Sequence, residues 1–218
     1  MSRSELVQLR RHKRPAPPAE LLADLAPSRF LPAPELADWC RVVFVDEGGP
    51  LHNEEHSHLT DASIGVLWTN VANGRQGRRI IGQAELGRPQ GAMGKWAKAR
   101  AAQQVEDWFG LIPDFIMTID AVYAAHCGDA EFCALTEHEL THMGQERDAF
   151  GLPKFTRAGR PVFGIRGHDL EEFTSIARRY GAVTPEMRAM KDALNGGPEI
   201  ATARLAQACG TCLGKRAA

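Results

Sequence analysis

The feature that most constrains this chain is a six-residue segment, 137–142, with the sequence Glu-His-Glu-Leu-Thr-His. It places His138 and His142 four positions apart, with Glu139 directly after the first His. Residues four apart in a helix project to the same side. Two imidazoles can therefore share one metal ion, and the carboxylate can accept a proton from a water that the ion activates. The same pattern also arises by chance on solvated helix faces, so its surroundings matter.

Those surroundings predict a strand that leads directly to the helix carrying the motif. Residues 114–120 have apolar side chains at alternate positions, which is typical of a strand. The helix is expected from about Asp129 to Gln145, because Gly144 and Pro153 limit how far it can continue. A motif on a helix that follows a strand favours the metal-site interpretation.

Further strands and helices are predicted from the same patterns. The strands are 41–46, 64–69 and 79–84, and the Gly-rich connection 73–77 predicts that the last two form an antiparallel pair. The helices are a core-facing one between residues 94 and 110, one at 170–180 with capping residues Asp169 and Glu172, one at 185–195, and one from 198 to about 209. Together they predict an α+β fold with a small sheet.

The first 36 residues differ in composition from the rest. They combine a basic run at 10–14 with six prolines, which favours an extended, weakly ordered arm that contains at most a short helix over 19–25. The remaining length suits one sizeable core. We therefore expect an arm at 1–36 and a single domain at 37–218.

A catalytic Zn²⁺ usually takes three protein ligands, so a third ligand is expected on another element. His168 stands 26 positions after His142, in a predicted loop, and Glu172 lies on the helix that follows. Because Glu172 already has a structural explanation as the capping partner of Asp169, we favour His168 over Glu172.

Asp148 is a third candidate, and we discount it. It lies six positions after His142, where one protease class has a third His. That class needs a Gly for the sharp turn, whereas this chain has its Gly one position early, at Gly144, with Gln145 in the required place.

Three segments, His138–His142, Gly167–Phe173 and Arg178–Gly181, resemble the metallopeptidases encoded by phages and prophages. More distantly they are similar to SprT-like small zinc proteases, although Phe173 follows His168 one residue later than in many of those sequences. The resemblance extends from about residue 39 to 212. It implies a zincin core, with a small mixed sheet, an active-site helix and a second packed helix, and it implies the cytoplasm of a bacterium or a phage-infected cell.

The chain is therefore expected to be a zinc-dependent endopeptidase that acts on a protein or peptide, with Glu139 as the general base. A donor for the developing oxyanion is also expected, with Tyr180 as the candidate and Arg178 beside it. The alternative is a noncatalytic zinc-binding or protein-interaction module that retains the zincin fold.

Two other clusters contain possible metal ligands. His56 and His58 would point to the same side of an extended segment, but we favour a polar loop over a second metal site there. Cys209 and Cys212 form a single C-x-x-C, which alone lacks the four ligands of a structural zinc site. We expect a structural tail, with Cys209 at the end of a helix.

Charge and hydropathy give little support for a nucleic-acid or membrane partner. The chain has 26 Lys and Arg against 27 Asp and Glu, so its overall field does not favour nucleic acid, and the basic run at 10–14 is only weak support for DNA association. There is no apolar stretch of the roughly 18 residues that a membrane span needs, and no secretory signal over residues 1–14. Reduced thiols and no membrane partner are expected.

Overall fold

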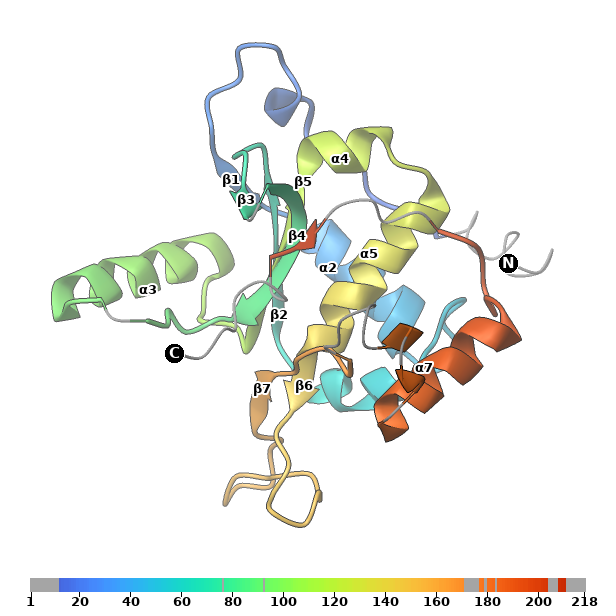
Figure 1. Cartoon of the computed structure of the whole chain (residues 1–218). Coiled ribbons are helices and arrows are strands. Elements are labelled where there is room, and N and C mark those ends of the chain that lie inside the picture. Colours follow the sequence, from blue (N-terminus) through green and yellow to red (C-terminus); the bar gives the residue numbers. More distant parts are fainter. Residues whose placement is uncertain are drawn as a thin grey trace.

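The computed structural model describes residues 12–75, 77–91, 93–170, 177–178, 180–182, 184–203 and 208–210. In this part of the chain a mixed six-stranded sheet has helices on both faces, and a smaller two-stranded sheet lies beside it (Figure 1). The protein has an α+β fold, as the sequence predicts. None of the described helices combines the length and apolarity that a membrane span requires.

The main sheet is organised around β5, which pairs with β2 on one side and β4 on the other. β2 runs parallel to β5 and β4 runs antiparallel to it, while β1 and β3 complete the two ends. A short strand, β8, pairs parallel with β4. The bounds are β1 (Phe30–Pro32), β2 (Ile64–Thr69), β3 (Gly74–Arg75), β4 (Arg78–Leu86), β5 (Phe115–Asp120) and β8 (Ala208–Cys209).

Strands β2, β4 and β5 confirm three of the predicted strands. The predicted antiparallel pairing of 64–69 with 79–84 is wrong, because β5 lies between them in the sheet. The Gly-rich connection does make a hairpin, but it joins β4 to the two-residue strand β3. The Gly-rich turn signal correctly predicted that the chain reverses its direction there. It did not identify the strand with which 64–69 pairs.

The two faces of the sheet have different cores. Val66 and Trp68 of β2 face the larger core, and Leu67, between them, faces the opposite side. There Leu67 contacts a small cluster with Val105 of α3 (Lys95–Phe109). α3 is confirmed, with Gly110 in the left-handed region at its C-terminus (φ 73°). Its expected core-facing character is only partly correct, because Val105 is its one buried residue.

The predicted strand at 41–46 is wrong. Helix α2 (Pro34–Cys40) continues directly into a π-helical turn, η2 (Arg41–Val45). Val43, Phe44 and Val45 are all buried in the larger core. A short continuous apolar run fits a buried strand and a buried helical turn equally well, and here it continues the helix that precedes it.

Part of the Pro-rich segment packs against the domain. A 3₁₀ turn, η1 (Ala19–Leu21), and strand β1 lie within it, and Leu21, Ala33 and Leu36 belong to the larger core. The division expected at residue 36 falls within α2. The prolines here restrict backbone conformation, and some of the apolar residues among them are buried, whereas Leu25 is 97% exposed.

The motif lies on α5 (Asp129–His142), which follows the short helix α4 (Ala121–His126). α5 ends three residues before the predicted end at Gln145, because Met143–Gln145 form β6 and pair antiparallel with β7 (Phe163–Ile165). Figure 1 shows the β6–β7 hairpin extending away from the end of α5. The predicted helix is therefore correct except for its last turn.

The C-terminal predictions have mixed outcomes. Helix α7 (Pro185–Gly196) is confirmed, with the Thr184 side chain accepting a hydrogen bond from the Met187 amide. The helix predicted from 198 to 209 is wrong, since residues 198–203 are not helical and Cys209 lies in β8. Most of the helix predicted at 170–180 lies outside the described residues, although 177, 178 and 180 are helical.

Candidate metal centre

The last turn of α5 brings His138, Glu139 and His142 to one place. The imidazoles of His138 and His142 lie on the same side of the helix, and their Nε2 atoms are 3.2 Å apart. His142 and Glu139 are buried, whereas His138 is half-buried. The motif therefore places one buried imidazole, one half-buried imidazole and a buried carboxyl at the same end of α5.

A third imidazole, that of His168, reaches the same place from the segment that follows β7, at the base of the β6–β7 hairpin. Its Nε2 lies 3.4 Å from the Nε2 of His138. The ring centroid of His168 is 5.1 Å from that of His142. The three imidazoles thus form one cluster in which a ligand nitrogen of each lies within 4.8 Å of the others.

The cluster is held by two hydrogen bonds between His142 and Arg166. The Arg166 amide donates to the His142 carbonyl at 2.8 Å, and His142 Nδ1 donates to the Arg166 carbonyl at 2.7 Å. The first bond fixes the end of α5 against the segment that carries His168. The second places the His142 proton on Nδ1, so that Nε2 keeps its lone pair for a metal ion.

The spacing of the three Nε2 atoms fits a zinc ion. Two nitrogens that are each about 2.0 Å from a tetrahedral Zn²⁺ lie about 3.3 Å from one another. The separations of 3.2 and 3.4 Å about His138 bracket that value. Neutral imidazole is a common zinc ligand, so both the chemistry and the spacing of the donors suit this metal.

The Glu139 side chain packs against Gly82 of β4, which has no side chain. A Cβ added at Gly82 would be 2.9 Å from Glu139 Oε1 and 2.9 Å from Leu135 Cδ1. Burial raises the pKa of the Glu139 carboxyl to about 8, and the neighbouring Cys209 adds to this rise. The buried carboxyl is therefore harder to ionise than an exposed one, and a divalent cation beside it would oppose this rise.

Cys209 also lies at the cluster, which the sequence-based expectation of a helix end did not anticipate. Its Sγ is 3.5 Å from His142 Nε2, and with His138 and Glu139 it forms a second group of closely spaced ligand atoms. Burial alone lowers the pKa of His142, but the hydrogen bonds with Cys209 and the Arg166 carbonyl outweigh it and raise that pKa. β8 has brought this thiol from the C-terminal region to the motif helix.

The other candidate residues have different positions. Glu172 lies outside the described residues, and Tyr180 is 65% exposed, so their roles stay predictions. Arg178 is also exposed. Asp148 forms a turn, in which its Oδ1 accepts hydrogen bonds from the amides of Phe150 and Leu152.

His56 and His58 lie on η3 (Glu54–Asp61), a 3₁₀ helix and not an extended loop. Their spacing therefore does not place both rings on one side, which was the basis for a second metal site. His56 is buried, and His58 Nε2 donates to the Met143 carbonyl at 2.7 Å. His58 thus ties η3 to the start of β6.

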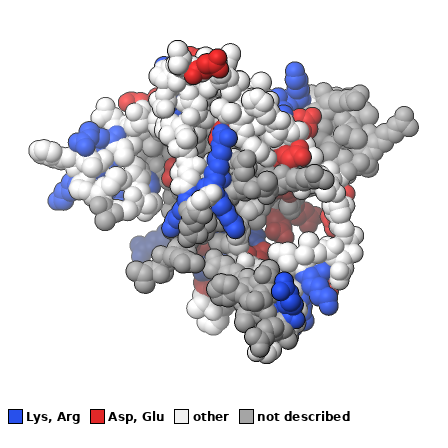
Figure 2. Space-filling view, turned by 45° about the horizontal axis from the view of Figure 1, so that its top comes forward, with Lys and Arg blue, Asp and Glu red and all other residues white. Residues whose placement is uncertain are grey.

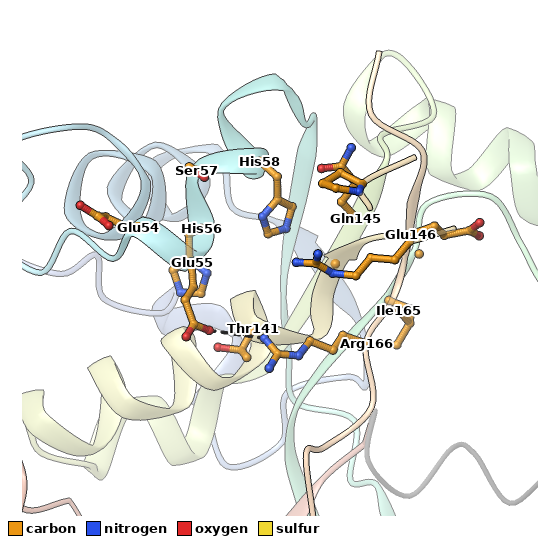
Figure 3. A pocket seen from close by; sticks show the side chains of 14 residues that line it. Glu54, Glu55, His56, Ser57, His58, Thr141, Gln145, Glu146, Ile165 and Arg166 are labelled. Carbon is orange, nitrogen blue, oxygen red and sulfur yellow. Dashed lines mark hydrogen bonds and ion pairs between the residues drawn. The ribbon is translucent and has the colours of Figure 1, made fainter. Parts of the chain in front are cut away.

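A cavity of about 710 Å³ lies beside the end of α5, and its lining does not include the three histidines of the cluster. η3 forms one wall, and the end of α5 with the β6–β7 hairpin forms the other. Figure 3 shows Glu55 and Arg166 meeting beside Thr141, and their charged groups are 3.4 Å apart. Two of its lining residues adjoin the cluster: Thr141 precedes His142 in α5, and the Arg166 backbone hydrogen bonds with His142. Its volume is in the range of ligand-binding clefts.

Surface charge on the described residues is mixed. On the face shown in Figure 2, basic side chains gather near the centre, and acidic side chains lie around them. This distribution agrees with the net charge of −1. This face therefore has no extended basic surface of the kind that tracks a nucleic-acid backbone.

Sequence reasoning missed three contributors to the cluster: Cys209, Gly82 and Arg166. Arg166 acts through its backbone, which any residue type could supply, and Gly82 acts by the absence of a side chain. Neither leaves a signal in a single sequence. Cys209 had a signal in its C-x-x-C, but the strand pairing that brings it to α5 spans more than 60 residues.

A family model with the description "Putative phage metallopeptidase" matches residues 37–195. The matched segment includes α5, the β6–β7 hairpin and α7. Neither a curated protein nor a solved structure matches the chain.

Proposed function

Since the chain belongs to this family of phage metallopeptidases, and the family implies a metal-dependent hydrolase, we propose that it is a zinc-dependent endopeptidase with a zincin core. The observation that carries the proposal is the convergence of three imidazole nitrogens on one point beside a buried glutamate. Histidine clusters of this spacing without a metal would place several lone pairs or protons against one another. As part of the same proposal, the enzyme acts in the cytoplasm of a bacterium or phage-infected cell.

His138, His142 and His168 would hold the ion, and Glu139 would act as the general base. When bound, Zn²⁺ polarises the scissile carbonyl and makes water more acidic. Glu139 accepts the proton of the attacking water and later delivers it to the leaving amine. The Arg166 carbonyl keeps the His142 ring oriented throughout, through the Nδ1 hydrogen bond of 2.7 Å.

The substrate is proposed to be a protein or peptide that lies in the cavity between η3 and the β6–β7 hairpin. The lining combines carboxylates of η3 with the Arg147 and Arg166 side chains, so it offers polar partners of both signs to a peptide backbone. β6 is paired only with β7 among the described strands, and beyond Met143, whose carbonyl accepts a hydrogen bond from His58, its residues Gly144 and Gln145 line the cavity. An extended peptide can add to such an edge by backbone hydrogen bonds.

The test is a comparison of Glu139→Gln with Glu137→Gln in the full-length chain. Both variants should retain one zinc per chain, measured by elemental analysis. Cleavage of a labelled, denatured protein should fall about 10²–10⁴-fold for Glu139→Gln, because the proton acceptor is lost. Glu137, whose Oε1 accepts a hydrogen bond from Asn53 at 2.9 Å, is the matched control and should retain cleavage. Equal cleavage by both variants would contradict the proposal.

The third ligand is tested by metal content alone. His168→Ala should lose zinc, and Glu172→Ala should retain it. The reverse result would assign the third position to Glu172.

The position of Cys209 favours a second candidate, a noncatalytic zinc-binding module. A thiol 3.5 Å from His142 Nε2 could complete four protein ligands, and four-ligand zinc sites are typically structural. This candidate predicts that Glu139→Gln and the unchanged chain are alike in zinc content and that neither cleaves any protein.

A further inference from the structure

We propose that Cys209 is a reversible fourth ligand of the proposed zinc ion, so that strand β8 holds the site closed and its release opens it. The proposal rests on the proposed metal site and adds a regulatory segment to it. In the closed form the thiolate stands where an attacking water must bind. The peptidase is then inactive while Cys209 is bound and active in the fraction of molecules from which β8 is released.

The distances from the Cys209 sulfur to the histidine nitrogens are the first argument for this ligation. A sulfur about 2.3 Å and a nitrogen about 2.0 Å from a tetrahedral zinc ion are about 3.5 Å apart. The Sγ of Cys209 is 3.5 Å from His142 Nε2. A ligand nitrogen of His138 lies within 4.8 Å of that sulfur. The thiol therefore stands at zinc-ligand spacing from an imidazole of the cluster and within reach of a second one.

The backbone around Cys209 is held by β4, so the position of the thiol is not that of a loose tail. Cys209 is opposite Gly82 in the parallel pairing, and the Gly210 amide donates to the Gly82 carbonyl at 2.8 Å. Gly210 is buried so closely that an added Cβ would be 2.5 Å from Gln83 Oε1. The chain at 208–210 thus fits β4 beside Glu139, whose own packing depends on Gly82.

The pairing of β8 with β4 is short enough to be reversible. β8 has two residues, and its register against β4 is interrupted between Ile80 and Gly82. It therefore adds few backbone hydrogen bonds, each of which contributes only about 1 kcal/mol net. Two-residue edge strands belong to the low-stability end of a fold, where local opening is common.

Ligation and release balance as acid–base steps. On binding, the Cys209 thiol gives its proton to solvent and the thiolate sulfur donates an electron pair to the metal. On release, the sulfur takes up a proton and water occupies the position that it leaves. No oxidant or other reactant is needed.

The test uses the full-length chain with Co²⁺ in place of zinc. The unchanged protein should show the near-ultraviolet absorption of a thiolate bound to cobalt, and Cys209→Ser should lose it. Cys127→Ser is the matched control and should retain the absorption. Cys127 is also a half-buried free cysteine, but it lies at the C-terminal end of α4, where Arg14 donates a hydrogen bond to its sulfur. X-ray absorption of the unchanged zinc protein should show one sulfur at about 2.3 Å, which needs no variant.

The outcomes separate this inference from the proposed function. Loss of the cobalt absorption in Cys209→Ser together with a gain in proteolysis supports both. Loss of the absorption with no proteolysis in any variant supports ligation by Cys209 and contradicts the peptidase. Absence of a sulfur signal from the unchanged protein overturns the inference, whatever the activity. A signal that Cys209→Ser retains also overturns it.

Discussion

Helices α3 and α5 lie on opposite faces of the same sheet and show opposite relations between sequence pattern and burial (Figure 1). α3 has apolar residues at helical spacing, yet Trp96 is 84% exposed and only Val105 is buried. α5 buries seven of its residues, and these include the ionisable Glu139 and His142. Burial of charged groups is costly unless they have partners or a task. The difference makes α5 the candidate functional helix.

Truncating one aromatic residue on α5 and one on α3 tests this difference in burial most directly. Phe132 of α5 is fully buried against Trp39 and Trp68, with ring centroids 5.7 and 6.2 Å away. Phe132→Ala should lower the free energy of unfolding by about 3–5 kcal/mol, because it removes a packed ring and leaves a cavity. Trp96→Ala on α3 should change it by no more than about 0.5 kcal/mol. Urea denaturation measures both, and similar losses would show that α3 contributes to stability more than its exposure indicates.

The second prediction concerns pH and the α5 side of the sheet. His56 packs near Glu137 of α5, and burial, with the neighbouring His58 charge, lowers the pKa of His56 from 6.5 to about 4. Between these values the unfolded chain binds a proton that the folded chain does not, so stability is present above pH 6.5 and falls as the pH drops toward 4. The loss should reach at most about 3 kcal/mol.

Urea denaturation at several pH values checks this dependence. His56→Leu should flatten the decline between pH 6.5 and 4. His126→Leu, which changes an exposed histidine on α4, should leave the decline unchanged. Equal slopes in the two variants would assign the acid sensitivity to other groups.

The smallest expected effect compares two glycines that face the two helices. Gly82→Ala would place a Cβ 2.9 Å from buried atoms of Leu135 and Glu139 on α5, at a cost of about 1–3 kcal/mol. Gly65→Ala would place one 2.7 Å from the Phe109 ring at the end of α3. That ring is only half-buried and can turn away, so the cost should stay below about 1 kcal/mol. Thermal denaturation ranks the two, and the opposite order would contradict the comparison.

Local signals in the sequence predicted much of the fold. The apolar run in 64–69, the alternation in 114–120, the glycine after Phe109 and the Thr184 cap each act within a few residues, and each element is present. The segment 41–46 failed because a short apolar run does not distinguish a strand from a buried helical turn. The pairing of 64–69 with 79–84 failed because β5, which separates them, comes later in the chain.

The candidate site, like the fold, has some residues that local sequence signals predict and others that they do not. His138 and His142 meet because of a spacing within one helix, and the structure brings His168 to them, as expected from its position in a loop. Cys209, Gly82 and the Arg166 backbone depend on pairings between distant strands. A single sequence carries no pattern for such pairings, so these contributors became visible only in three dimensions.

The β6–β7 hairpin separates the site from the sequence between its strands. Met143 pairs with Ile165 at its base, whereas residues 146–162 extend to a tip where Phe150 is 88% exposed. Doubling the length of a flexible loop costs only about 0.6 kcal/mol in closure entropy. Because the base already fixes His142 against Arg166, natural variants can lengthen, shorten or recompose the tip and still align the three imidazoles. The outer part of the tip, around the exposed Phe150 and away from the cavity-lining Arg147, is thus a suitable place to graft a foreign peptide.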